Sequence, residues 1–205
     1  RIATYIHQIP AAIELIQDAH EKGYETTVNI MAISKSFDDE LDEVLAQLAK
    51  TPVDVIYIAD SFGSFYPEQI RKLTEKYLSF AQKSGKKVGI HAHNNLQLAY
   101  ANTLEAMIYG ASFLDVTVSG LGRGAGNCPL ELLLGFLKNP KYKQMPVLEF
   151  IENYIVELEK KLDWGYSIPY MITGQLNEHP RAAMKARDEG DTKYREFFKN
   201  ISFME

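Results

Sequence analysis

The sequence predicts an α/β fold in which helices cover a parallel β-sheet. Short, almost continuously apolar segments recur along the chain, and segments with helical spacing of apolar residues separate them. Strands that are apolar on both faces are typical of a parallel sheet, because helices cover that sheet. Regular alternation of such strands with helices is the βα pattern.

Each expected strand is rich in β-branched and aromatic residues. The strands are 2–6 (IATYI), 26–31 (TTVNIM), 53–59 (VDVIYIA), 87–93 (KVGIHAH) and 113–119 (FLDVTVS). Helical spacing is found in 11–20, 38–50 and 96–110, with Pro10 and Pro67 at helix starts and Gly23, Gly85 and Gly110 at helix ends. After the fifth strand only helices are expected, at 129–137, 147–162 and 179–190.

Two architectures fit this order, an open doubly wound sheet and a (β/α)8 barrel without its first three units. The barrel is favoured because no phosphate-loop glycine pattern follows the first strand, and because closure removes exposed sheet edges. We therefore predict an incomplete TIM barrel with strands 4 to 8 in residues 1–140, and a helical C-terminal extension in residues 141–205. Arg1 already lies in a strand-like segment, so the missing units are expected upstream.

Composition excludes several classes of function. The formal net charge of −5 disfavours binding to nucleic acid or to an anionic membrane. Apolar runs such as residues 55–59 are far shorter than the roughly 20 residues of a membrane span. Cys128 is the only cysteine, so no intrachain disulfide can form, and a reducing, cytoplasmic location is expected.

Two of the five histidines, His91 and His93, lie together at the end of the fourth strand. Residues two apart in a strand point to the same face, so both imidazoles should enter the mouth of the barrel, where active sites of this fold lie. Two neutral imidazoles can begin a divalent-metal site. Hydrogen bonds to backbone carbonyls are the alternative, but the adjacent Asn94 and Asn95 favour a site.

A glycine-rich segment, SGLGRGAGN (residues 119–127), follows the fifth strand. Glycine allows positive φ angles and a close approach of the backbone to a ligand. The loops after the last barrel strands often bind anions. A tight turn without a ligand is the alternative for this segment.

These motifs carry a family resemblance. Residues 91–131, HAHNNLQLAYANTLEAMIYGASFLDVTVSGLGRGAGNCPLE, resemble the metal-dependent lyase superfamily that includes hydroxymethylglutaryl-CoA lyase and isopropylmalate synthase (the HMG-CoA lyase-like, or DRE-TIM, metallolyases). RIATYI resembles the fourth strand and VIYIADSFG (55–63) the sixth strand of the pyruvate aldolase branch, which includes the 4-hydroxy-2-oxovalerate aldolases. The resemblance covers about residues 1–137.

The resemblance implies a set of site residues. It identifies His91, His93 and, as a further candidate, Asn127 as ligands of Mn²⁺ or Mg²⁺. Family members complete this site with an Asp-Arg pair at the end of the first strand. This sequence has only Arg187-Asp188, in a charged helical segment and a poor substitute for that pair, so the absence of the motif is the largest departure from the family pattern.

The resemblance also indicates where substrate would bind. Ser61 matches a serine near the keto acid in the aldolases, and Gly124 and Gly126 are candidates for substrate contact. Tyr166 and Tyr170 are candidates for a catalytic tyrosine. The aromatic run at 194–203 (YREFFKNISF) is expected to cover a hydrophobic surface.

The implied function is a divalent-metal-dependent aldolase, a carbon–carbon lyase that cleaves a 4-hydroxy-2-oxo acid to pyruvate and an aldehyde. Two alternatives remain, a Claisen-type condensing enzyme that uses an acyl-CoA and a catalytically silent barrel that serves as a binding scaffold. The expected partner is a small 2-oxo acid. A homodimer and a complex with a dehydrogenase, which some of these aldolases form, are left open.

Overall fold

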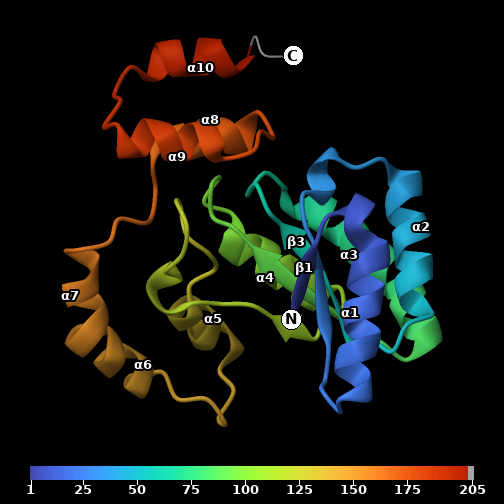
Figure 1. Cartoon of the computed structure of the whole chain (residues 1–205). Coiled ribbons are helices and arrows are strands. Elements are labelled where there is room, and N and C mark those ends of the chain that lie inside the picture. Colours follow the sequence, from blue (N-terminus) through green and yellow to red (C-terminus); the bar gives the residue numbers. More distant parts are fainter. Residues whose placement is uncertain (203–205) are drawn as a thin grey trace. The chain divides into compact units, whose positions relative to one another are not determined.

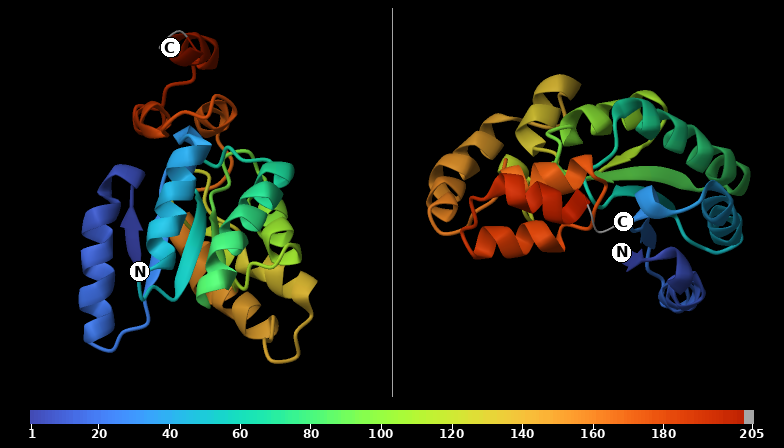
Figure 2. Two further views of the ribbon diagram at one scale, coloured as in Figure 1. Left: turned by 90° about the vertical axis from the view of Figure 1, so that its right-hand side faces the viewer. Right: turned by 90° about the horizontal axis from the view of Figure 1, so that it is seen from above.

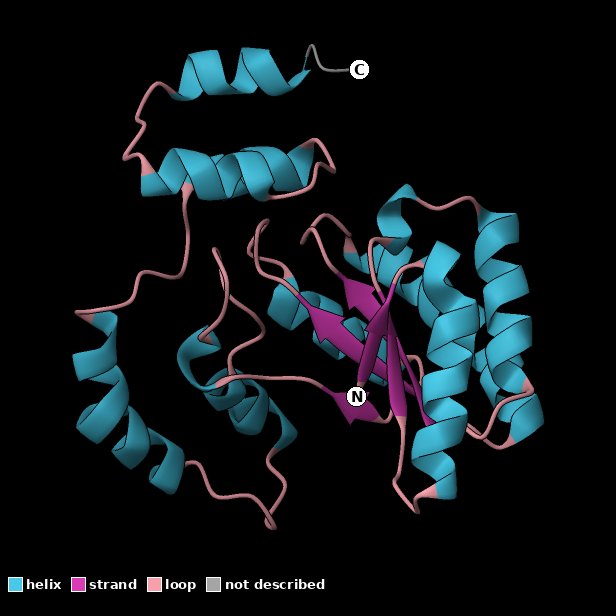
Figure 3. Ribbon diagram, in the orientation of Figure 1, coloured by secondary structure: helices cyan, strands magenta, loops and turns pink. Residues whose placement is uncertain are grey.

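A five-stranded parallel sheet, as the sequence predicted, is the centre of the fold (Figures 1 and 3). The computed structural model of the chain describes residues 1–202. The strands are β1 (Ile2–Thr4), β2 (Thr27–Ile30), β3 (Val55–Asp60), β4 (Lys87–Ala92) and β5 (Phe113–Leu114). They pair in sequence order, β1-β2-β3-β4-β5, which is the order of consecutive strands in a (β/α) barrel.

Alternate residues of the central strands form the core beneath the helices. Fully buried aliphatic side chains occur at every second position, namely Val28, Ile30, Ile56, Ile58, Val88 and Ile90. Since side chains alternate across a strand, the residues between them lie on the other face of the sheet. That other face carries Asn29, Tyr57 and Gly89, of which Tyr57 and Gly89 are directly paired in the register.

The helices that follow the strands lie along the outer face of the sheet (Figure 2). They are α1 (Ile9–Glu21), α2 (Asp38–Ala49), α3 (Pro67–Ala81) and α4 (Ala99–Ile108), with short 3-10 turns at Ile6–Gln8, Ile33–Lys35 and Gln82–Ser84. Each of α1 to α3 has a buried apolar stripe, which includes Ile16, Leu45 and Ile70. Pro67 begins α3, where its missing N–H costs nothing.

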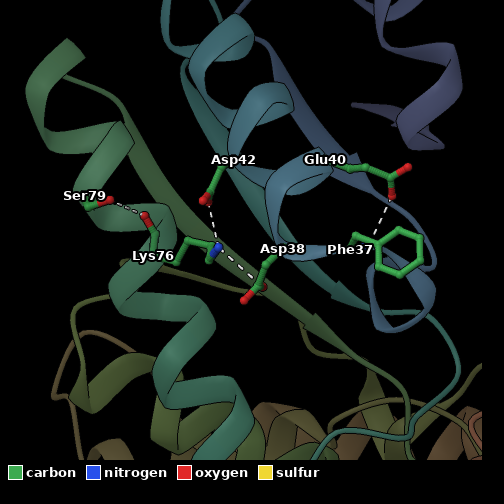
Figure 4. A network of polar contacts seen from close by, with 6 residues as sticks. All are labelled: Phe37, Asp38, Glu40, Asp42, Lys76 and Ser79. Atoms are coloured by element: carbon green, nitrogen blue, oxygen red, sulfur yellow. Dashed lines mark hydrogen bonds and ion pairs between the residues drawn. The ribbon is translucent and has the colours of Figure 1, made fainter.

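Ion pairs join α2 to α3 (Figure 4). Lys76 Nζ lies 2.7 Å from Asp42 Oδ1 and 3.4 Å from Asp38 Oδ1. Burial by itself would lower the pKa of Lys76, but the hydrogen bond and charge of Asp42, together with Asp38, outweigh it and raise that pKa. At the start of α2, Glu40 accepts a hydrogen bond from the Phe37 backbone N–H at 3.1 Å.

The prediction of a fifth strand over residues 113–119 is wrong beyond Leu114. β5 ends there, and Val118–Gly120 form a 3-10 turn in which Ser119 has a φ of 53°. The turn places Ser119 O where the indole N–H of Trp164 donates to it at 3.0 Å. Alternating apolar residues predicted a longer strand, but this tertiary contact and the glycines that follow favour a turn.

The chain divides into two compact units. The first consists of residues 1–61, 65–92 and 101–115, and holds the sheet. The second consists of residues 62–64, 93–100 and 116–205. The boundary predicted at residues 140 and 141 stays a prediction.

The second unit is mostly helical. Its helices are α5 (Leu130–Leu137), α6 (Met145–Phe150), a π-helical turn (Ile151–Ile155), α7 (Val156–Glu159), α8 (Ile168–Gln175), α9 (Arg181–Asp188) and α10 (Tyr194–Ser202). A π-turn therefore interrupts the continuous helix expected at 147–162. Every helix within residues 1–202 falls short of the length and apolarity needed to cross a membrane.

Helices α8 and α10 were not expected from the sequence. They contribute to a second hydrophobic core, formed by Ala125, Tyr170, Ile172, Ala183, Ala186, Phe197 and Ile201. Phe197 and Ile201 of the aromatic run pack in this core, whereas Phe198 is 43% exposed. Phe203, the last aromatic residue of that run, lies outside the described residues.

Candidate functional site

His91 lies near the carboxyl end of β4 and contacts a carboxylate from the next strand. Its Nδ1 is 3.0 Å from Asp115 Oδ2. Asp115 directly follows β5, and its backbone N–H donates to Ile90 O at 3.0 Å, which continues the parallel register past Leu114.

Arg1 binds the same carboxylate. Arg1 Nη2 donates to Asp115 Oδ1 at 2.7 Å, and Nη1 lies 2.6 Å from Oδ2. Burial by itself would raise the pKa of Asp115, but the hydrogen bonds from His91 and Arg1 outweigh burial and hold that pKa below its ordinary value. The carboxylate is therefore ionised at neutral pH.

His93, one residue beyond β4, pairs with the end of the glycine-rich segment. His93 and Asn127 form an antiparallel bridge, and Asn94 N donates to Gly126 O at 2.9 Å. Asn127 Nδ2 donates to Leu121 O at 3.1 Å. Asn127 Oδ1 is buried and accepts no hydrogen bond from the described residues. A buried amide oxygen without a donor is a position that a cation could satisfy.

Packing within the loop accounts for its glycines. A side chain at Gly124 would overlap the ring of Tyr170, and one at Gly126 would overlap Gly120 O. Both glycines also have positive φ angles, 62° and 82°. These contacts explain the need for glycine at both positions, and substrate contact there stays a prediction.

Residues from the C-terminal helices hold this loop in place. Arg187 Nη1 donates to Gly124 O at 3.0 Å, and Gly165 N donates to the same oxygen at 2.9 Å. Arg187 also forms an ion pair with Asp163. Through Arg187, the Arg187-Asp188 pair therefore has a structural role at this loop.

The two candidate tyrosines differ sharply in environment. Tyr170 is 3% exposed and packs against Gly124, and burial raises the pKa of its hydroxyl. Tyr166 is 59% exposed. Of the two, Tyr170 is the residue placed beside the glycine-rich segment.

Ser61, directly after β3, is oriented by the neighbouring loop. Its Oγ accepts a hydrogen bond from the Ala32 backbone N–H at 3.0 Å. Ala32 has a φ of 56°, which is unusual for a residue other than glycine. Such backbone strain is found where the surroundings hold a functional group in place.

The β3–α3 and β4–α4 loops of the second unit pack against α8 and the segment after it. Asn95 Nδ2 donates to Tyr170 O at 3.4 Å, and Ser64 Oγ donates to Asn177 Oδ1 at 2.8 Å. The His179 ring lies edge-on to Phe62, with centroids 5.4 Å apart. The sequence did not predict these contacts, because apolar spacing did not reveal α8.

The donor set suits a divalent cation only in part. Within residues 1–202, no three His, Cys, Asp or Glu side chains are grouped so that they could hold a metal ion. Imidazole nitrogen, as at His91 and His93, is nevertheless a ligand of transition-metal ions such as Mn²⁺, and amide oxygen, as at Asn127, suits both Mn²⁺ and Mg²⁺. The orphaned Asn127 Oδ1 is the feature of this chain that fits such an ion.

The order of the parallel strands defines the chain as part of a (β/α) barrel. The sequence profile of the HMGL-like family matches residues 4–151. The chain belongs to this family.

Relatives of known name agree with this assignment. The chain is 36% identical over 138 residues to an oxaloacetate decarboxylase of Mycobacterium tuberculosis, a match that covers 67% of this chain and 40% of the relative. It is 32% identical over 169 residues to a 4-hydroxy-2-oxovalerate aldolase of Geobacillus thermodenitrificans, with 79% and 48% covered. The chain thus spans about half the length of these relatives or less.

A solved structure has the same fold. It is the N-terminal domain of a Bacteroides vulgatus protein provisionally classed as an aldolase, and it superposes with a TM-score of 0.83 at 29% identity. The superposition covers 98% of this chain and 66% of the other. The expectation of a barrel segment is confirmed.

Proposed function

We propose that the full-length protein is a divalent-metal-dependent lyase that cleaves a 4-hydroxy-2-oxo acid to pyruvate and an aldehyde. Family membership and the aldolase-named relatives support this proposal. The observation that carries it is the buried Asn127 Oδ1, which has no donor and belongs to a residue paired with His93.

The proposed metal ligands are His91, His93 and Asn127, with Mn²⁺ or Mg²⁺ as the ion. Only Ala92 separates the two histidines, so an extended chain directs both imidazoles to one side. Asn127 would add its amide oxygen. When bound, the ion would act as a Lewis acid on the keto group of the substrate.

The residues of the chain would have distinct tasks around the keto acid. Ser61, whose Oγ accepts a hydrogen bond from Ala32 N–H, would contact the keto acid. The backbone at Gly124 and Gly126 would contact the substrate. Tyr170 is the better candidate for proton transfer from the substrate hydroxyl, because it packs on the same loop, whereas Tyr166 is exposed.

A second candidate function is decarboxylation of oxaloacetate. The Mycobacterium tuberculosis relative of that name shares 36% identity with this chain. Loss of CO₂ from oxaloacetate and aldol cleavage both leave the electrons of the broken bond on pyruvate as an enolate. The same cation and the same donors would therefore serve either reaction.

The test is a His93→Ala substitution in the full-length protein, with His20→Ala as the control because His20 is an exposed histidine of α1. We expect metal-dependent pyruvate release from a 4-hydroxy-2-oxo acid to fall more than about 100-fold, with weaker Mn²⁺ binding by calorimetry. The control should behave as the wild type. Unchanged turnover and unchanged metal content in His93→Ala would overturn the proposal.

Substrate assays separate the remaining alternatives. Pyruvate release from oxaloacetate alone would favour the decarboxylase, and condensation of a 2-oxo acid with acetyl-CoA would favour the Claisen-type reaction. A protein that binds none of these compounds would be a scaffold. A homodimer and a dehydrogenase partner stay predictions, which the mass of the full-length protein in solution, alone and with an added dehydrogenase, would test.

A further inference from the structure

The carboxylate of Asp115 has both oxygens engaged, by His91 of β4 and by Arg1, which precedes β1. Oδ2 lies 3.0 Å from His91 Nδ1 and 2.6 Å from Arg1 Nη1, and Oδ1 accepts from Arg1 Nη2 at 2.7 Å. The Asp115 side chain is 17% exposed and that of His91 is 25% exposed. The fork of two parallel hydrogen bonds from Arg1 holds the carboxylate in one orientation.

The aromatic ring of Tyr57 holds the guanidinium group of Arg1 in place. Its guanidinium carbon lies 4.7 Å from the centroid of the Tyr57 ring, in a cation–π contact. Tyr57 covers Gly89, its partner in the register, where a Cβ would come within 2.5 Å of the ring. A glycine at this position thus allows the ring to lie flat against β4 and support Arg1.

These contacts decide which nitrogen of His91 carries the proton. An ionised carboxylate can only accept hydrogen bonds, so the nitrogen facing it, Nδ1, must be the donor. In the neutral ring, Nε2 then carries the lone pair. A carboxylate on the far nitrogen also makes an imidazole a stronger metal ligand. Asp115 itself is a poor ligand in this arrangement, because Arg1 uses both of its oxygens.

We propose that Asp115 is a positioning residue that keeps His91 protonated on Nδ1, so that Nε2 faces the divalent cation, and that Arg1 holds Asp115 in this role. The proposal rests on the proposed function, in which His91 is a metal ligand. It assigns a task to two residues, Arg1 and Asp115, that the family resemblance left without one.

The experiment has two readouts in the full-length protein. Nitrogen-15 NMR of the metal-free protein reports the tautomer of His91 directly. Calorimetry with Mn²⁺ reports affinity. We expect the Nδ1–H tautomer in the wild type, a loss of its predominance in Asp115→Asn, and Mn²⁺ binding weakened about 10- to 100-fold in that variant.

Two further variants keep the test decisive. Arg1→Gln leaves Asp115 in place without its anchor, and we expect a smaller loss of Mn²⁺ affinity, about tenfold or less. Asp54→Asn is the matched control. Asp54 directly precedes β3 in the same unit, and its Oδ2 accepts a hydrogen bond from the Thr26 backbone N–H at 2.7 Å. It is therefore a hydrogen-bonded aspartate that does not contact His91 in that bond. The control should retain both the tautomer of His91 and the affinity for Mn²⁺.

The two proposals fail in different ways. Wild-type protein that does not bind Mn²⁺ would overturn the proposed function. Wild-type protein with His91 as the Nε2–H tautomer would overturn the role of Asp115, whether or not metal binds. Metal binding in Asp115→Asn as tight as in the wild type would overturn that role while leaving the proposed function intact.

Discussion

Tyr77 and Asn127 both bury a polar atom that finds no hydrogen-bond partner among the described residues. Tyr77 lies on α3 with its side chain completely buried in the apolar core, and burial raises the pKa of its hydroxyl. Asn127 lies beside His93 at the end of the glycine-rich segment. An orphaned hydroxyl inside a core only costs stability, whereas the orphaned amide oxygen of Asn127 is the atom that the proposed cation would satisfy.

We predict that Tyr77→Phe stabilises the protein by about 1 to 2 kcal/mol, because it removes a buried hydroxyl without a partner and keeps the ring. Urea unfolding of the full-length protein measures this. Tyr24→Phe is the matched control, since Tyr24 is 67% exposed; its effect should stay within about 0.5 kcal/mol. A clear loss of stability in Tyr77→Phe would contradict the prediction.

At the scale of elements, the helices that were predicted and those that were missed differ in their surroundings. Helices α1, α2 and α3 bury one stripe against the sheet, so apolar spacing located them. Helix α8 is buried on most sides, with Pro169, Tyr170, Ile172, Thr173 and Gly174 all inaccessible. A helix without a polar face shows no amphipathic period, so the spacing of apolar residues did not predict α8.

The segment after α8 should make stability depend on pH. Burial is the main cause that lowers the pKa of His179 below 6.5; Arg181 and Arg123 lower it further, and Glu178 opposes them. Below pH 6.5 the unfolded chain therefore binds more protons than the folded chain. The stabilising contribution is complete above this pH and is lost as the pH falls through the folded-state pKa.

This dependence can be measured as the urea midpoint of the full-length protein at about pH 7.5 and about pH 5. In His179→Gln the drop in midpoint should be smaller than in the wild type. His20→Gln, in which an exposed histidine of α1 is replaced, should show the wild-type drop. An identical drop in all three proteins would show that His179 is not responsible.

At the scale of the whole molecule, metal binding should stabilise the full-length protein, because the proposed ligands come together only in the folded chain. His91 and Asn127 are 36 positions apart in the sequence, so the unfolded chain does not bring them together. We expect about 2.7 kcal/mol of added stability when free Mn²⁺ is 100 times its Kd, and a lower melting temperature after chelation. The melting temperature is measured by scanning calorimetry in Ca²⁺-free buffer, once with added Mn²⁺ and once with EDTA. A melting temperature that does not respond to Mn²⁺ or to chelation would argue against a metal site.

The amino-acid sequence alone determined the order of the five strands and the helices between them, and the His-Ala-His motif at the end of β4. These are local features, set by apolar spacing, glycine and proline over stretches of about ten residues. The sequence also predicted the barrel correctly, because consecutive parallel strands leave few alternatives.

Only the tertiary structure decided what surrounds the histidines. Arg1, which precedes β1, and Asp115, which follows β5, are 114 residues apart in the sequence and come from the two outermost strands of the sheet, so only the folded chain brings them together. The unpaired oxygen of Asn127, the end of β5 at Leu114 and the burial of α8 depend in the same way on contacts between distant segments. No local pattern encodes such contacts, because each is set by the register and packing of elements that the chain brings together only on folding.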